Sequence, residues 1–149
     1  MQVLLENEQK TLAFGQKLAA LCEHVQIILL KGPLGAGKTT LTRGLLQGLG
    51  YRGTVKSPTY TLVETYTLDH RTVHHFDLYR LGGTHALEEM GVRDYFSEDA
   101  LCLIEWPEKI NTPIVADLIC SLEILGNQRQ ISIIAQTPAG RQVIEQLQS

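Results

Sequence analysis

A short glycine-rich segment carries the clearest chemical signal in this sequence. From Gly32 to Thr39 the chain reads GPLGAGKT, which matches the Walker A pattern G-x-x-x-x-G-K-[ST] at every fixed position. Glycines allow turns in which consecutive backbone N–H groups point at a phosphate. In such a loop Lys38 reaches the β- and γ-phosphates, and the hydroxyl of Thr39 binds Mg²⁺. The segment therefore predicts a phosphate-binding loop.

The residues on either side of this segment have the patterns of a strand and a helix. Residues 25–30 are an apolar run of the length of a buried strand. Leucines then recur at helical spacing, at Leu41, Leu45, Leu46 and Leu49. Gly50 stands where a helix C-cap is expected. A strand, a glycine loop and a helix in this order aim a helix N-terminus at phosphates, so the context favours a nucleotide site over a chance glycine turn.

Two acidic residues that follow strand-like runs are candidates for the rest of the site. Glu105 follows the apolar residues 100–104, and ligands of such folds bind at the carboxyl ends of parallel strands. We expect it to bind Mg²⁺ directly or through water, the alternative being a carboxylate in solvent. Asp77 ends a second run and could hold a metal-bound water, orient an attacking water, or begin a turn.

Several other residues near these motifs have two open interpretations. Residues 51–60 form either a plain connection or a nucleotide-sensing loop. Thr59 would lie near a γ-phosphate if the segment 57–60 folds over the site. Trp106 is either a wedge against the nucleotide or a packing residue. His74 and His75 are adjacent in a strand and point to opposite faces, which favours core packing for one of them. Arg80 could contact a phosphate or pair with a carboxylate.

The composition is that of an ordinary globular domain. We expect residues 1–149 to form one α/β domain, since 149 residues suffice for one core and no repeat or linker is evident. The net charge of −3 argues against a protein that binds mainly to nucleic-acid backbones. Three widely spaced cysteines support neither a disulfide framework nor a zinc site. No signal peptide or membrane span is apparent, so we expect a cytoplasmic protein.

Patterning elsewhere predicts helices and two hairpins. Helices are expected at 7–22 with Asn7 as N-cap, at 86–90, and from Pro138 onward. Strand pairs are expected at 61–68 with 72–78 and at 117–125 with 129–136. Because such short connections join antiparallel strands, we expect a mixed sheet.

Four motifs together resemble the TsaE (YjeE) family, bacterial ATPases required for making threonylcarbamoyladenosine in tRNA. They are 35–40, 57–60, 75–80 and 105–108, in the family's order and at about its spacing over essentially the whole chain. The resemblance implies a three-layer P-loop fold with a mainly parallel mixed sheet. It also implies ATP or ADP with Mg²⁺ as ligands, slow hydrolysis, and TsaD and TsaB as partners, with tRNA reached only through that complex.

The resemblance also assigns roles to residues of this chain. Thr39 and Glu105 become the magnesium ligands, and Lys38, Asp77 and Glu105 the catalytic set, with Asp77 the catalytic or water-positioning acid. The nucleotide-binding residues are Gly35, Ala36, Gly37, Lys38, Thr39, Thr40, Thr59 and Trp106.

Two other functions remain open on the residues alone. A small-molecule kinase shares the Walker A loop, but it usually needs a lid bearing arginines, and the short acidic region 82–99 offers Arg93. A binding module would take up ATP and hydrolyse none. No strong candidate for an arginine finger or a lone general base stands out, so we expect low activity in isolation.

Overall fold

The computed structural model describes residues 1–81, 91–97, 99–110 and 114–149. The helix expected at 86–90 lies outside this range. The described helices are α1 (Glu8–Ala19), α2 (Lys38–Gly48), α4 (Pro138–Gln148) and the short 3₁₀ helices η1 (Val92–Tyr95) and η2 (Pro107–Lys109). The described strands are β1 (Gln2–Leu5), β2 (Ile27–Lys31), β3 (Val63–Thr67), β4 (Thr72–Asp77), β5 (Ala100–Glu105), β6 (Leu118–Leu125) and β7 (Gln128–Ala135).

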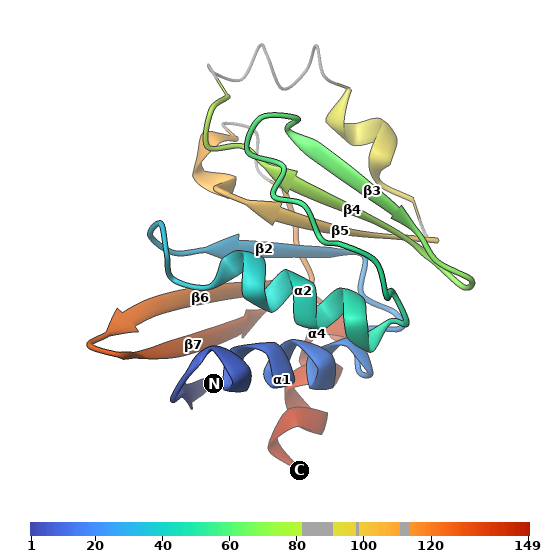
Figure 1. Ribbon diagram of the computed structural model, residues 1–149. Coiled ribbons are helices and arrows are strands. Elements are labelled where there is room, and N and C mark those ends of the chain that lie inside the picture. The colour runs from blue at the N-terminus through green and yellow to red at the C-terminus, as the bar shows by residue number, and fades with distance from the viewer. Residues whose placement is uncertain (82–90, 98, 111–113) are drawn as a thin grey trace.

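Within the described residues the strands form one seven-stranded sheet in the order β1-β7-β6-β2-β5-β4-β3 (Figure 1). The central strands β6, β2, β5 and β4 are parallel. β1, β7 and β3 pair antiparallel at the two margins. The mixed sheet and both predicted hairpins are therefore confirmed, whereas β1 was not anticipated from the sequence.

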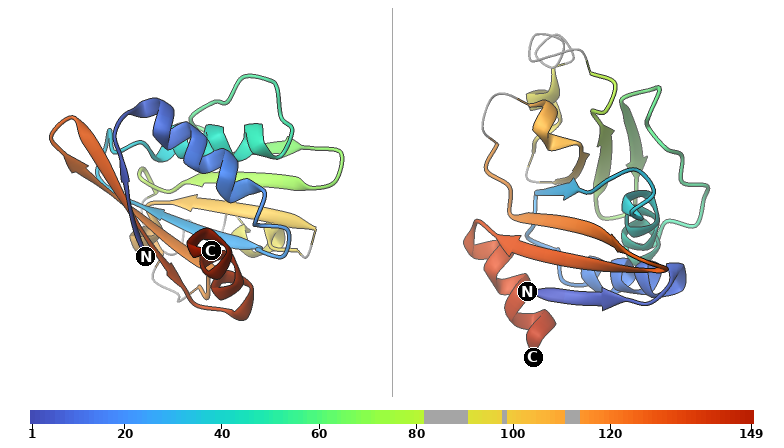
Figure 2. Two further views of the ribbon diagram at one scale, coloured as in Figure 1. Left: turned by 90° about the horizontal axis from the view of Figure 1, so that it is seen from below. Right: turned by 90° about the vertical axis from the view of Figure 1, so that its left-hand side faces the viewer.

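The two faces of the sheet are covered differently. α1 and α2 lie side by side on one face (Figure 2). Ile28 and Leu30 of β2 join a core cluster with side chains of α1, α2 and α4. Leu29 points to the opposite face and joins a second cluster with residues of η1 and the segments around η2. This alternation is the two-residue period of a strand that is buried on both sides.

Glycines bring α1 and α2 unusually close together. A Cβ added at Gly44 of α2 would lie 2.2 Å from the carbonyl oxygen of Leu12, and one added at Gly15 of α1 would lie 2.5 Å from that of Leu41. The backbones of the two helices are therefore in direct contact. α2 is held against α1 along its length, which places its N-terminus relative to the sheet.

The ends of the elements follow the local signals. The side chain of Asn7 accepts a hydrogen bond from the N–H of Lys10, as an N-cap does. Gly50 follows α2 with φ of 100°, a left-handed conformation that suits glycine. Pro138 begins α4, and the hydroxyl of Thr137 caps it. In the part of the chain described here, no helix is both long enough and apolar enough to cross a membrane.

Candidate functional site

The parallel strands end at the edge of the sheet where the glycine loop begins. Leu30 of β2 is in register with Glu105 of β5, which is in register with Asp77 of β4. The loop then connects β2 to α2. The two candidate acids and the loop are thus brought to one place by strand pairing, as expected for ligand sites of parallel sheets.

The loop depends on backbone conformations that favour glycine. Gly32, Gly35 and Gly37 have φ of 146°, 80° and 104°. A Cβ on Gly32 would also lie 2.7 Å from the carbonyl oxygen of Leu122 in β6. Gly37 is the N-cap residue of α2, so the free N–H groups of the first turn face the space in front of the loop.

A cavity of about 290 Å³ lies in front of the loop. It brings together every predicted site residue except Ala36, which is buried and lines a second cavity. The cavity is lined by Leu34, Gly35, Gly37, Lys38, Thr39, Thr40, Ser57, Thr59, Asp77, Glu105 and Trp106. Segments from four parts of the chain therefore converge on one space.

Lys38 is buried at the centre of this group, with 5% of its surface exposed. Its ammonium donates a hydrogen bond to the carbonyl oxygen of Gly32 and lies 3.8 Å from the centre of the Trp106 ring. Burial lowers the pKa of Lys38, and the nearby Glu105 and Asp77 oppose that shift. The charge is thus held by a backbone oxygen and an aromatic face, both of which anionic phosphate oxygens could replace.

Trp106 packs into this site through a left-handed backbone conformation, with φ of 58° and ψ of 52°. Left-handed backbone is unfavourable for a residue with a bulky side chain. The ring contacts Tyr79 at 4.8 Å between centroids as well as Lys38. Trp106 is therefore a wall of the cavity and a packing residue at once, so the two interpretations of the sequence are compatible.

The two acids have separate hydrogen-bond donors. One carboxylate oxygen of Asp77 accepts from the N–H of Tyr79 at 3.0 Å, and the other accepts from the hydroxyl of Thr59 at 3.2 Å. Asp77 thus begins a turn and also lines the cavity, while Thr59 links it to the 57–60 segment. One oxygen of Glu105 lies 2.5 Å from Nε2 of His75.

The two adjacent histidines point to opposite faces, as predicted. His75 is fully buried, on the same face of β4 as Asp77. His74 makes an edge contact with Tyr95 on the other face, at 4.8 Å between ring centroids. The sequence predicts that one histidine is packed inside, but it does not predict that this histidine contacts Glu105.

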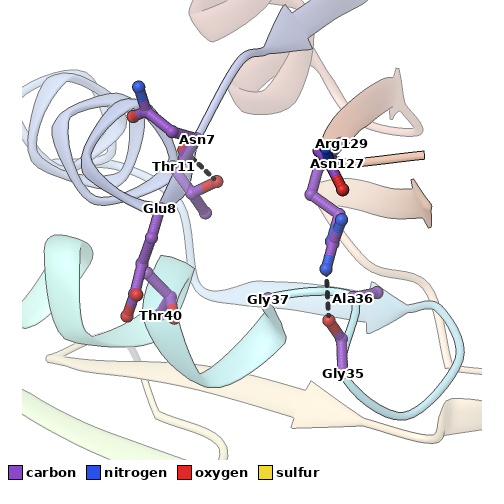
Figure 3. Close-up of a pocket in the computed structure, with 9 residues that line it drawn as sticks. All are labelled: Asn7, Glu8, Thr11, Gly35, Ala36, Gly37, Thr40, Asn127 and Arg129. Carbon is purple, nitrogen blue, oxygen red and sulfur yellow. Dashed lines mark hydrogen bonds between the residues drawn. The ribbon is translucent and has the colours of Figure 1, made fainter. Parts of the chain in front are cut away.

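A second cavity, of about 330 Å³, lies on the other side of the loop (Figure 3). Its walls come from the start of α1, from the loop and from the turn between β6 and β7. Arg129 donates a hydrogen bond to the carbonyl oxygen of Gly35 at 3.2 Å across this space. The lining residues are Asn7, Glu8, Thr11, Gly35, Ala36, Gly37, Thr40, Asn127 and Arg129. Gly35, Gly37 and Thr40 belong to both cavities, so the two meet at the loop.

Sequence reasoning missed this second cavity and the contact partner of Arg80. Asn127 and Arg129 reach the loop because β6 is the neighbour of β2, and no local pattern reveals that strand order. The guanidinium of Arg80 lies over the ring of Tyr60, 4.4 Å from its centre. The sequence offered a phosphate or a carboxylate as its contact, and not an aromatic ring. The spacing of His75 and Asp77, two residues apart in a strand, was the one available signal that both face the site.

The mixed sheet, with its Walker A segment between β2 and α2, defines an α/β protein with a cavity at the carboxyl ends of parallel strands. The family model described as threonylcarbamoyl adenosine biosynthesis protein TsaE matches residues 5–136. This chain belongs to the TsaE family, and the expectation from its motifs is confirmed.

Individual relatives agree with this assignment. A Haemophilus influenzae protein named tRNA threonylcarbamoyladenosine biosynthesis protein TsaE is 47% identical over 146 residues, covering 94% of this chain and 92% of its own. An Aquifex aeolicus protein of the same name is 35% identical over 135 residues, covering 89% and 94%. The crystal structure of Bacillus subtilis YdiB superposes with a TM-score of 0.81 at 27% identity, covering 99% of this chain and 93% of its own.

Proposed function

We propose that this protein binds ATP with Mg²⁺ and hydrolyses it slowly, as an accessory ATPase acting on the TsaD–TsaB complex in tRNA threonylcarbamoyladenosine synthesis. Membership of the TsaE family supports the pathway. The observation that carries the ATPase activity is the convergence of Lys38, Thr39, Asp77 and Glu105 on one cavity in front of the glycine loop.

The phosphates are proposed to occupy the cavity in front of the loop. The backbone N–H groups at the start of α2 donate to phosphate oxygens there, and the helix dipole adds partial positive charge. Lys38 supplies a full charge and would move its hydrogen bond from Gly32 to a phosphate oxygen. The contact with Trp106 makes the fluorescence of that residue, the single tryptophan of the chain, a reporter of this change.

The donor set of the site fits a hard divalent cation. Glu105 and Asp77 supply carboxylate oxygens and Thr39 supplies a hydroxyl, and Mg²⁺ prefers oxygen ligands from one or two side chains, phosphates and water. Thr39 and Glu105 would hold the ion, which neutralises phosphate charge when bound. Asp77 would orient water, because it lies opposite Glu105 across the strand pair.

The nucleoside is proposed to occupy the second cavity. A nucleotide whose phosphates lie against the loop must extend its nucleoside past one side of it. The second cavity shares Gly35, Gly37 and Thr40 with the first, and about 330 Å³ can hold a group of this size. Arg129 would lie against the nucleoside from the β6–β7 side, and Asn7 from the α1 side (Figure 3).

The test of this function is phosphate release from Mg-ATP by the purified protein, with and without the TsaD–TsaB pair. We expect weak basal release, stimulation by the pair, and loss of both in Lys38→Ala. A second readout is the affinity for ADP, measured by Trp106 fluorescence. We expect Arg129→Ala to lower the affinity for ADP several-fold and to leave the affinity for inorganic pyrophosphate, measured by competition, unchanged.

Three outcomes would contradict the proposal. If the protein binds nucleotide but releases no phosphate from ATP, alone or with the TsaD–TsaB pair, it would be a binding module and not an ATPase. A phosphorylated metabolite as product would indicate a kinase. Release that the pair does not stimulate would contradict the assigned partners while leaving the nucleotide site in place.

A further inference from the structure

We propose that His75 is a positioning residue, which holds the carboxylate of Glu105 in the orientation that binds the magnesium ion of the nucleotide complex. This inference rests on the proposed function. It assigns a role to a side chain that touches neither nucleotide nor ion.

The geometry of the pair is that of a strong, fully enclosed hydrogen bond. Nε2 of His75 lies 2.5 Å from Oε2 of Glu105, and both side chains are almost completely buried. The carboxylate can only accept, so the imidazole donates through Nε2–H. Hydrogen bonds to charged groups in such surroundings are among the strongest in proteins. Rotation of the Glu105 carboxylate would break this bond inside the protein.

The register of the strands explains why Glu105 needs such a partner. Asp77 of β4 is directly opposite Glu105 of β5, and His75 is two residues before Asp77 on the same face. Two carboxylates placed side by side repel each other, and hydrogen-bond donors to each of them offset that cost. Asp77 is held by Thr59 and the N–H of Tyr79, and Glu105 is held by His75.

The other ring nitrogen of His75 argues against a role confined to packing. Nδ1 is buried and has no hydrogen-bond partner among the described residues. A buried polar atom without a partner is unfavourable, and an apolar side chain of similar volume would avoid that loss. The imidazole thus forms one hydrogen bond, to Glu105, at the expense of an unsatisfied nitrogen.

The arrangement leaves one oxygen of Glu105 for the cavity. Oε2 is taken by His75, and Oε1 accepts no hydrogen bond within the described chain. Glu105 itself lines the cavity beside Lys38 and Thr39. A carboxylate held by an outer hydrogen bond and presenting its second oxygen is a common arrangement around bound metal ions.

The experiment measures binding of Mn²⁺, a spectroscopic substitute for Mg²⁺, to the protein–ADP complex by electron paramagnetic resonance. ADP affinity is measured separately in EDTA. His75→Leu removes the donor and keeps a similar volume, whereas His75→Gln keeps an N–H near the position of Nε2. We expect His75→Leu to weaken Mn²⁺ binding about 10–100-fold, the range typical of lost outer partners. ADP affinity in EDTA should stay within about twofold, and His75→Gln should recover most of the Mn²⁺ affinity.

The inference fails if His75→Leu binds Mn²⁺ as the wild type does, or if its ADP affinity in EDTA falls by the same factor as its Mn²⁺ affinity. The second result would mean that His75 only supports the fold. A wild-type protein that binds no ADP under either condition would instead overturn the proposed function, and the inference with it.

A measurement on the wild type keeps the inference testable if His75→Leu does not fold. In ¹⁵N-histidine NMR spectra the His75 signals should show a proton on Nε2, and they should shift when Mg²⁺ is added to the ADP complex. Signals that do not respond to Mg²⁺ would refute the coupling between His75 and the ion.

Discussion

Replacing Gly44 by alanine should destabilise this protein, although alanine is the better helix former. At an ordinary helix position the change from glycine stabilises by about 1 kcal/mol. Here the new Cβ would lie 2.2 Å from the carbonyl oxygen of Leu12 and 3.1 Å from the Cα of Gly15. An ordinary contact between such atoms is about 3.5 Å, so the distance to the carbonyl oxygen of Leu12 is far too short. Both neighbouring atoms belong to helix backbone, so neither can rotate away.

The two helices must therefore separate, which is a case of overpacking. Such changes cost about 1–3 kcal/mol, and sometimes more. The rigid backbone contacts here place the cost in the upper part of that range, at about 2–3 kcal/mol, which exceeds the gain of about 1 kcal/mol in helix propensity. We expect a net loss of about 1–2 kcal/mol in the free energy of unfolding. For a protein of this size that lowers the melting temperature by about 2–8 °C. Because α2 begins at the glycine loop, where the phosphates are proposed to bind, ADP affinity should fall as well.

The measurement is thermal and urea unfolding of a graded series. A Cβ would meet its nearest neighbour at 2.2 Å in Gly44→Ala, 2.5 Å in Gly15→Ala and 2.7 Å in Gly48→Ala, and the losses should follow that order. Gly48 is the mildest case because its shortest distance, 2.7 Å to the Cβ of Ala19, is the longest of the three. An unchanged or higher melting temperature for Gly44→Ala would refute the reasoning.

Two further predictions concern stability away from the loop. Burial raises the pKa of the Cys120 thiol from 9.0 to about 12. The folded state therefore keeps this proton more tightly than the unfolded state, and the resulting stability is present below about pH 9 and lost as the pH rises toward 12. This stability amounts to about 4 kcal/mol in full. The free energy of unfolding measured in urea should therefore fall less steeply between about pH 8 and pH 10.5 for Cys120→Ala than for the wild type. Equal slopes would contradict this. Asp117 accepts hydrogen bonds from the N–H groups of Gln26 and Ile27 and from the hydroxyl of Thr137. Asp117→Ala should cost about 1–3 kcal/mol in thermal unfolding because it leaves two backbone donors unpaired, and Asp117→Asn should cost less because its carbonyl can still accept; equal losses would refute this role.

Residues close in the sequence were well predicted because their signals are local. The Walker A segment, the strand before it and the helix after it require only the chain itself, since glycine turns and apolar periodicity act over a few residues. The Asn7 cap, Gly50 after α2 and both hairpins follow from the same short-range chemistry. β1 was missed because four residues at the margin of a sheet have too short a pattern.

The residues that line the cavity in front of the loop were predictable in their types, and less so in their contacts. Asp77 and Glu105 could be chosen because they end strand-like runs, and the parallel register of β4, β2 and β5 then brings them to the loop. The hydrogen bond from His75 to Glu105 could not be foreseen. It requires that β4 and β5 be neighbours, in a register that places His75 of β4 diagonal to Glu105 of β5.

The sequence by itself therefore determined the glycine loop, the elements around it and the family to which the chain belongs. Only the tertiary structure decided the strand order β6-β2-β5-β4, which places Arg129 against Gly35 and His75 against Glu105. The physical reason is the range of the interactions. Turns, caps and periodicity are encoded within a few residues, whereas strand order is set by burial of both sheet faces over the whole chain.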